Sequence, residues 1–333
     1  MRIGVVVSCY RQERFLARTV AAIERALAGR EWNGVLELAV LGGEPLPALS
    51  ERWRVVSAFD PVTGRPGRPL TPGAGRMLGF AACGGDWVLF VDSDVEVDAD
   101  WMDAAIATAA SGPSPAGVFG RIEEWFVDGT REWRNRDDMY ATGDRDTDVG
   151  YFAALAFYRR DALQAVGGYD TRLHSDEDFE LGLRLRARGF VLRSLGRLAA
   201  RHWSPPRPNV AELGRRWRTG ICFGQGEVLR LYAGRRGFGA LLWRQRFFLA
   251  AIALWSLGAV ALAVSLVRQD LRPLAAWAAT PLAVIALMAA RKRSLRLGTL
   301  SLLTWTVQGA GLIVGLVRRE DDRPARPAAE VRC

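Results

Sequence analysis

Two carboxylates separated by one residue follow an apolar segment near residue 90. Asp92 and Asp94 flank Ser93, directly after the apolar run Val88 to Val91. A short continuous apolar run is typical of a strand buried in a parallel sheet, so both carboxylates are expected at its carboxyl end. Their oxygens are the ligands that Mg²⁺ and Mn²⁺ prefer, and such an ion stabilises the charge of a departing diphosphate. The pattern predicts a metal site, with a turn or a helix cap as the alternative.

A second acidic group marks the expected start of a helix. After Gly167-Gly168-Tyr169-Asp170, the run Ser175 to Leu181 holds four acidic residues, among them Glu177 and Asp178, and an apolar helical pattern then ends at Gly189. Acidic side chains at this position complement the helix macrodipole. One of them could equally be a general base that removes a proton from a hydroxyl group. The residues alone leave both interpretations open.

The first two thirds of the chain alternate between apolar runs and amphipathic segments. Strands are expected over 3–7, 35–41, 53–59 and 87–91, and helices over 15–27 and 77–83. Alternation of this kind predicts an α/β doubly wound sheet that binds its ligand beyond the carboxyl ends of the strands. Those ends hold Ser8-Cys9-Tyr10, Gly42-Gly43-Glu44 and Asp92-Ser93-Asp94.

The last third contains three long segments without a charged residue. They cover 247–267, 274–290 and 297–317. Each is close to the length that crosses the hydrocarbon core of a bilayer, so three spanning helices are expected. Buried helices of a soluble domain are the alternative, which the lack of a polar face disfavours.

Positive charge is concentrated just before these segments. The chain has a formal net charge of +9, and residues 201–246 contain ten arginines and two glutamates. Anionic lipid headgroups explain a basic segment beside an apolar span better than nucleic acid does. With Trp217, Phe223 and Leu229 interleaved, residues 210–232 are expected to form a helix in the membrane interface, with a solvated surface helix as the alternative.

Four scattered cysteines and the start of the chain indicate the compartment. The cysteines form no CxxC pair, which favours a reducing environment over a disulfide framework. The apolar run Ile3 to Val7 is too short for a signal peptide, so the first domain is expected in the cytoplasm. Basic residues before the first span and between the second and third favour the same side. We expect a multi-pass protein of the cytoplasmic membrane whose tail emerges on the opposite side, with a re-entrant third segment as the alternative.

These observations divide the chain into four parts. Residues 1–205 are expected to form the catalytic domain, 206–245 the basic interfacial segment, 246–318 the transmembrane region and 319–333 a polar tail.

Taken in order, the motifs of residues 3–205 resemble the family 2 glycosyltransferases, which have the GT-A fold. Val5 to Glu13 is similar to that family's first strand and nucleotide loop, and Gly75-Arg76-Met77 to its Ala-Arg-Asn segment. The block from Gly85 to Asp94 resembles its Gly-Asp, strand and DxD sequence, and the block from Gly167 to Gly189 resembles its GG(F/Y)D, ED and RL sequence that ends at a glycine.

The resemblance implies specific roles. Tyr10 would lie against the nucleobase, and Asp92 and Asp94 would hold Mn²⁺ or Mg²⁺ with the donor diphosphate. Asp178 would be the base of an inverting displacement, and Glu177 would shape the acceptor pocket.

Two further residues have roles that the sequence leaves open. Arg76 would contact the nucleotide or its phosphates, or else be an ordinary surface arginine. His202 would be a further metal ligand, or else a structural histidine.

The chain also departs from the family pattern. Where members carry an acidic pair after the second strand, only Glu44 is available, so the donor cannot be named. Only Arg216 and Trp217 remain of a Q/R-x-x-R-W motif that members acting on lipids or polymers use for the acceptor.

The implied partners are a nucleotide-sugar donor, a lipid-linked or glycan acceptor of the cell envelope, and membrane lipids. A metal-dependent nucleotidyltransferase is the alternative enzyme, although Ser8 to Glu13 lacks the expected glycines. A degenerate membrane scaffold is the non-enzymatic alternative.

Overall fold

The chain folds into two compact units. The structure, a computed structural model, describes residues 1–10, 13–40, 46–58, 71–112, 114–206, 210–235, 237–318 and 329–332. One unit, here called the sheet unit, consists of Met1–Leu173, Glu177–Pro206 and Asp321–Cys333. The other, called the helical unit, consists of His174–Asp176 and Arg207–Glu320.

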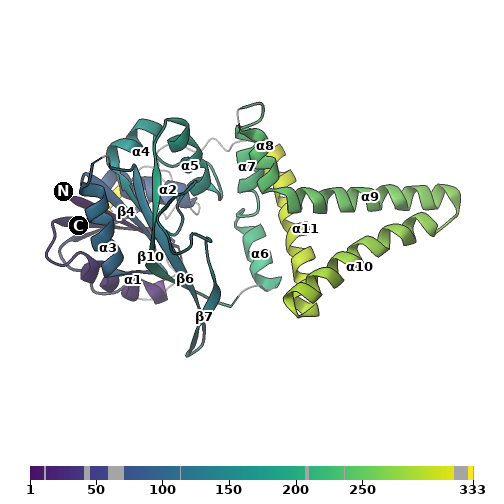
Figure 1. Ribbon diagram of the computed structural model, residues 1–333, viewed down its shortest axis with the longest axis horizontal. Coiled ribbons are helices and arrows are strands. Elements are labelled where there is room, and N and C mark those ends of the chain that lie inside the picture. The colour runs from purple at the N-terminus through teal and green to yellow at the C-terminus, as the bar shows by residue number, and fades with distance from the viewer. Residues whose placement is uncertain are drawn as a thin grey trace. The chain divides into compact units, whose positions relative to one another are not determined.

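A single mixed sheet organises the sheet unit (Figure 1). Its order along the main path is β11-β3-β2-β1-β4-β9-β6-β10-β5, with β7 paired to β6 and β8 to β10. The strands are β1 (Ile3–Tyr10), β2 (Trp32–Val40), β3 (Trp53–Ala58), β4 (Trp87–Asp92), β5 (Val95–Val97), β6 (Gly117–Asp128), β7 (Arg131–Asp138), β8 (Thr147–Asp148), β9 (Leu155–Arg159), β10 (Leu192–Ser204) and β11 (Ala329–Arg332). Strands β3, β2, β1 and β4 are parallel, whereas β9 runs antiparallel to β4. The expected α/β sheet is thereby confirmed.

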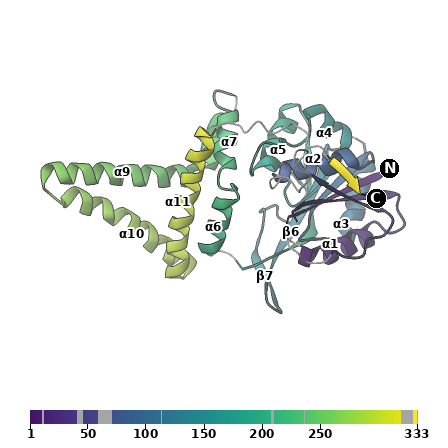
Figure 2. The same ribbon diagram turned by 180° about the vertical axis from the view of Figure 1, so that it is seen from behind.

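Helices cover both faces of this sheet (Figures 1 and 2). They are α1 (Glu13–Ala26), α2 (Pro72–Ala82), α3 (Ala99–Ala110), α4 (Arg160–Val166) and α5 (Glu177–Ala187). Helix α1 contacts α3, and α2 contacts α5. The side chain of Asp98 accepts a hydrogen bond from the backbone N–H of Trp101 and so caps α3.

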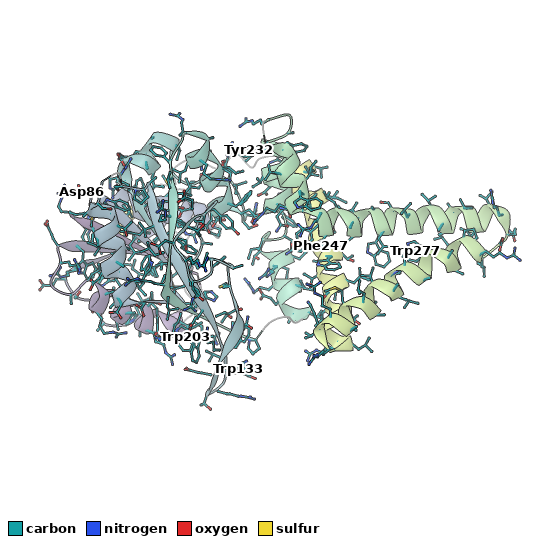
Figure 3. All side chains as sticks on the ribbon, viewed as in Figure 1. Asp86, Trp133, Trp203, Tyr232, Phe247 and Trp277 are labelled. Atoms are coloured by element: carbon teal, nitrogen blue, oxygen red, sulfur yellow. The ribbon has the colours of Figure 1, made fainter. Side chains whose placement is uncertain are left out.

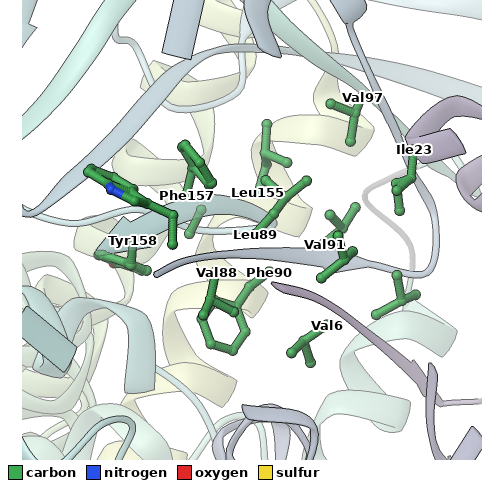
Figure 4. Close-up of a cluster of buried hydrophobic side chains, with 14 of the residues drawn as sticks. Val6, Ile23, Val88, Leu89, Phe90, Val91, Val97, Leu155, Phe157 and Tyr158 are labelled. Carbon is green, nitrogen blue, oxygen red and sulfur yellow. The ribbon is translucent and has the colours of Figure 1, made fainter. Parts of the chain in front are cut away.

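The core lies on both sides of β4, because successive side chains of a strand point to opposite faces. Val88 and Phe90 point toward the face that holds Val6, whereas Leu89 and Val91 point toward the face that holds Phe157 and Leu155 (Figure 4). The Phe80 ring of α2 stacks on Phe90 at 6.2 Å between centroids. Helix α2 therefore covers the face of even-numbered β4 residues, which includes Asp92.

The helical unit contains six helices within the described residues. They are α6 (Val210–Arg218), α7 (Gly224–Leu231), α8 (Phe238–Arg244), α9 (Arg246–Arg268), α10 (Arg272–Lys292) and α11 (Leu295–Val317). The expectation of one continuous helix over 210–232 is wrong. Gly220 adopts a left-handed φ of 78° between α6 and α7, and a Cβ there would lie 2.4 Å from the His174 ring. The glycine turn and the adjacent ring end the first helix.

Helices α9 and α10 form a hairpin that begins beside α11 (Figures 1 and 2). Trp277 of α10 lies between them (Figure 3), where its indole N–H donates to the carbonyl of Leu254 at 2.9 Å. Three helices, α9, α10 and α11, are long and apolar enough to cross a membrane. Buried residues make up 11%, 0% and 44% of their most apolar windows, respectively. Helix α11 is the one that packs extensively within the unit.

The end of the chain does not lie where the sequence indicated. Backbone pairing joins Ala329–Arg332 antiparallel to β3, from Ala329 opposite Ala58 to Arg332 opposite Val55. A tail on the opposite side of a membrane from the sheet unit is incompatible with this strand. How many of the three long helices cross a membrane stays a prediction.

Candidate active site

A buried arginine gathers acidic residues from two distant motifs. Arg76 of α2 donates a hydrogen bond through Nη2 to Asp92 Oδ1 at 2.8 Å, at the end of β4. Its Nη1 donates to Glu177 Oε1 and lies 3.5 Å from Asp178 Oδ1, both at the start of α5. The predicted metal carboxylate and the predicted base are thus brought to one place. The sequence had left Arg76 as a nucleotide contact or a surface residue, and the second of these is wrong, since the side chain is 8% exposed.

The first two residues of α5, Glu177 and Asp178, have different environments. Glu177 is bound to Arg76, and its side chain is 6% exposed. Asp178 is 16% exposed and sits at the longer distance from the same guanidinium. Glu177 is therefore engaged in holding Arg76, whereas Asp178 retains access to a ligand.

The carboxylates of this cluster favour the charged form of Arg76. Burial alone would lower the pKa of Arg76, but the carboxylates of Asp178, Asp92 and Glu177 outweigh burial and raise that pKa well above its ordinary value. Arg76 is thus a permanent cation that offsets part of the repulsion among three carboxylates. The cluster retains net negative charge, which suits a cation.

The loop that contains Gly168 and Tyr169 contacts Arg76 and the neighbouring Met77 of α2. Gly168 has a φ of 72°, and a Cβ there would lie 2.4 Å from Met77 Sδ, so a larger residue would be strained and would push the Met77 side chain aside. The next residue, Tyr169, is buried, and its ring centroid lies 5.4 Å from the Arg76 guanidinium carbon. A cation over an aromatic face is stabilised by the ring quadrupole. Gly168 therefore supplies the left-handed turn that precedes Tyr169, whose ring contacts Arg76.

The remaining predicted metal residues form a pair. His202 of β10 lies with its Nε2 3.5 Å from Asp94 Oδ2, and both side chains are buried. The other ring nitrogen of His202 has no hydrogen-bond partner among the described residues. Across the described part of the chain, no group of three or more His, Cys, Asp and Glu side chains is placed to hold a metal ion. Any ion would need further ligands from a bound molecule.

Other predicted site residues lie elsewhere or outside the description. Tyr10 ends β1, and its side chain is outside the described residues, as is all of Glu44. Arg216 and Trp217 belong to α6 in the helical unit. Arg216 donates to Glu212 at 2.9 Å, and the Trp217 ring packs edge-on against Phe223 at 5.3 Å. Burial would raise the pKa of Glu212, but Arg215 and Arg216 together lower it to about 2.

The sequence analysis did not identify one buried carboxyl group, that of Glu37 in β2. Ser8 pairs in register with Glu37 on one side and Asp92 on the other, so the three side chains form a row beneath α2. Glu37 is 1% exposed, and neither of its oxygens has a hydrogen-bond partner among the described residues. Burial raises the pKa of Glu37 to about 8. An acidic residue inside an otherwise apolar strand was the available signal.

The family is shown by comparison with known proteins. The model described as "Glycosyl transferase family group 2" matches residues 87–290, more than half of the chain. This chain therefore belongs to that family, as the motifs had indicated.

Individual relatives cover less of the sequence. A pre-mycofactocin glycosyltransferase of Mycobacterium tuberculosis, in strains CDC 1551 / Oshkosh and ATCC 25618 / H37Rv, is 33% identical over 132 residues. The match covers 37% of this chain and 28% of that protein.

Two crystal structures of S. aureus TarS 1–349 are also similar. The complex with UDP-GlcNAc has a TM-score of 0.49 and 14% identity, covering 93% of this chain and 91% of that one. The other has a TM-score of 0.46 and 15% identity, with coverages of 66% and 65%.

Proposed function

We propose that this protein transfers a sugar from a nucleotide-diphosphate sugar to an acceptor hydroxyl by a single, inverting displacement. The observation that supports it best is the Arg76 cluster, which joins the carboxylate at the end of β4 to the acidic start of α5. Family membership supports the same reaction class.

In the proposed reaction Asp178 is the general base. The acceptor oxygen forms a bond to the anomeric carbon as the bond from that carbon to the diphosphate breaks. The acceptor proton passes to the Asp178 carboxylate, and the electron pair leaves with the nucleoside diphosphate. Asp178 is favoured over Glu177 because it is the more accessible of the two and the less tightly bound to Arg76. Arg76 and Glu177 are positioning residues in this scheme.

The donor set suits a hard divalent cation. Carboxylate oxygens of Asp92 and Asp94 and the Nε2 of His202, which lies 3.5 Å from Asp94 Oδ2, are chemically acceptable ligands for Mn²⁺ or Mg²⁺. When bound, the ion would supply positive charge to the leaving diphosphate. Because the described residues offer no complete cage, the donor phosphates would supply the missing ligands.

We also propose that the protein acts at the cytoplasmic face of a membrane, on a lipid-linked or cell-envelope glycan acceptor. The exposed apolar sides of α9 and α10 favour lipid around them. With β11 in the sheet, the two helices cross as a hairpin and α11, the most buried of the three, stays on the side of the sheet unit. The basic helices α6 to α8 would contact anionic headgroups.

Reporter fusions test this arrangement directly. Reporters after Gly239, Asp270, Arg293 and Cys333 should read inside, outside, inside and inside. An outside signal after Cys333 would restore three crossings, and an outside signal after Gly239 would reverse the orientation.

The reaction is tested with purified protein in detergent, Mn²⁺ and a panel of nucleotide-sugars, by measuring released nucleotide with and without native membranes. Sugar-bearing products identified by mass would fix donor and acceptor. Pyrophosphate release from a nucleoside triphosphate would favour a nucleotidyltransferase, and no binding or turnover with any donor would favour the scaffold.

A further inference from the structure

The chain enters the helical unit for three residues immediately before α5. It leaves the sheet unit after Leu173, and the next three residues, His174–Asp176, belong to the helical unit. It returns to the sheet unit at Glu177, the first residue of α5. We call His174–Asp176 the entry segment. The proposed base, Asp178, follows this segment by only two positions in the sequence.

A buried pair of side chains holds the first residue of the entry segment. Glu227 of α7 accepts a hydrogen bond through Oε2 from the backbone N–H of His174 at 2.9 Å, and its Oε1 lies 2.7 Å from His174 Nδ1. The His174 side chain is 13% exposed and that of Glu227 is 7% exposed, so water competes little for these contacts. One carboxylate therefore fixes both the backbone and the ring of His174.

The other two residues of the entry segment are also held within the helical unit. Ser175 Oγ donates a hydrogen bond to the carbonyl of Ile221 at 2.8 Å, and a Cβ at Gly224 would overlap Ser175. The Asp176 carboxylate lies 3.5 Å from Arg244 Nη2, at the end of α8. Each of the three residues thus has its own attachment within this unit.

These attachments hold a backbone conformation that Asp176 would not adopt by preference. Its φ is 60°, in the left-handed region that favours glycine. Such conformations of other residues cost free energy and persist only where the surrounding structure imposes them. Without its attachments the entry segment is expected to relax. The first turn of α5, which begins at the next residue, would then shift with it.

We propose that Glu227 and His174 are positioning residues for the base, an inference that rests on the proposed glycosyl transfer. Glu227 fixes His174, the entry segment fixes the start of α5, and the start of α5 carries Asp178. A general base must lie within hydrogen-bond reach of the proton that it removes, so a small displacement of Asp178 slows transfer. In the proposed scheme the nucleotide is bound at the end of β4, and its affinity should not change.

Substitutions at both partners test this role. Glu227→Met keeps the length of the side chain but offers no oxygen, and His174→Ala removes the ring. Glu227→Gln is the conservative variant, because its amide oxygen can accept from the backbone N–H while its NH2 group donates to a neutral imidazole. Gly309→Ala is the control. Its Cβ would lie 2.9 Å from the Phe248 carbonyl oxygen, so it loosens α11 against α9 elsewhere in the same unit.

Transfer is measured in detergent with UDP-glucose, UDP-N-acetylglucosamine and UDP-galactose plus native membranes, and UDP affinity by calorimetry. Glu227→Met and His174→Ala should lower kcat by about tenfold to a hundredfold, the scale of a misplaced reacting group, with UDP affinity and donor KM unchanged. Glu227→Gln should keep kcat close to that of wild type. The double variant of Glu227→Met and His174→Ala should lose no more than either single variant, because one residue acts through the other.

Three outcomes of the kinetic assay would overturn the proposal. The first is an unchanged kcat in Glu227→Met. The second is an equal loss of kcat in Gly309→Ala, which would mean that any loosening of the helical unit has this effect. The third is a loss of UDP affinity that matches the loss of kcat, which would indicate general disruption of the sheet unit.

Hydrogen exchange separates this inference from the proposed reaction, because it needs no turnover. The amide N–H groups of Leu181 and Gly182 have the carbonyls of the first two residues of α5 as their helical acceptors. They should exchange faster in Glu227→Met and remain unchanged in Gly309→Ala. That result would support the positioning of α5 even if no donor were turned over. If wild type turns over a donor while Glu227→Met alters neither kcat nor exchange, the reaction stands and the positioning role fails.

Discussion

The sheet unit and the helical unit place their apolar side chains in opposite environments. In the sheet unit, the large apolar side chains of β1 and β4 are essentially inaccessible, and the charges that enter the interior are paired, as Arg76 is with Glu177. In the helical unit, Leu257, Leu282 and Leu287 of the α9–α10 hairpin are between 63% and 69% exposed. A face of this kind is stable only when another apolar medium covers it.

The difference indicates which changes each unit should tolerate. Charge and hydrogen bonding decide the behaviour of the sheet unit, because its buried polar groups have few alternatives. Close backbone packing decides the behaviour of the helical unit, because transfer to lipid provides little drive for one apolar helix to bind another. Substitutions that alter one property at a time can test this contrast.

The largest effect is expected from the metal carboxylates. Asp92→Asn and Asp94→Asn each remove a negative charge from the proposed ion site, and transfer should fall to background, as it should for wild type in EDTA. Asp103→Asn, at an exposed position of α3, is the matched control and should retain activity. Nucleotide release is measured with Mn²⁺ added back. Undiminished wild-type turnover in EDTA would contradict the proposal that the reaction needs a metal.

The next effect concerns the base. Asp178→Asn should reduce turnover by about 10² to 10⁴ while nucleotide binding changes little, the range expected for loss of a general base. Product configuration, read by NMR, should be inverted in wild type. Equal losses of turnover and nucleotide affinity would make Asp178 structural, and a retained configuration would exclude a single displacement.

A third effect should appear in stability as a function of pH. Burial raises the pKa of Glu37 from 4.5 to about 8, so the folded state keeps a proton that the unfolded chain releases. Stability should therefore fall as pH rises from 4.5 to 8, by an amount on the order of 5 kcal/mol. Glu37→Gln should remove this loss and raise the unfolding midpoint at pH 8.5 while changing little at pH 4.

Chemical denaturation in detergent at both pH values measures that effect. Glu31→Gln, at an exposed position just before β2, is the control and should leave the pH profile unchanged. If Glu37→Gln shifts the midpoint equally at both pH values, the carboxyl is not held neutral by the fold.

Residue patterns within single segments of the sequence predicted several of the strands and helices. The apolar runs of β1 and β4 and the uncharged lengths of α9, α10 and α11 fix those elements locally, and the structure contains all of them. Strands β6 and β7 were not predicted, because charged residues such as Glu123 and Arg134 interrupt any simple alternation.

The site was predicted as separate motifs rather than as one arrangement. Arg76 and Glu177 are 101 residues apart, and only the folding of α2 beside α5 brings them together. The same holds for β11, whose partner β3 is about 270 residues earlier in the chain. Short-range patterns contain no information about such pairs, so their geometry required the structure.

The smallest predicted effect tests the packing of the helical unit. Gly311 and Gly315 are four residues apart in α11, the spacing by which helices approach closely in membranes. A Cβ at Gly315 would lie 2.0 Å from the Phe223 carbonyl oxygen, and one at Gly226 of α7 would lie 2.0 Å from the Leu312 carbonyl oxygen. The contact is between backbones, which cannot move aside as flexible side chains can. Helices α7 and α11 are thus held at a distance that only glycine permits.

Gly315→Ala should therefore separate these two helices at a cost of about 1 to 3 kcal/mol, the usual penalty of overpacking. Gly214→Ala in α6 is the matched control, because nothing lies within 4 Å of its added methyl group. Alanine there should stabilise the helix by about 1 kcal/mol, since it restricts the unfolded chain. Thermal unfolding in detergent, with hydrogen exchange of α7 and α11, measures both variants. Faster exchange confined to α7 and α11 in Gly315→Ala is expected, whereas equal behaviour of the two variants would mean that the helices can shift apart without loss.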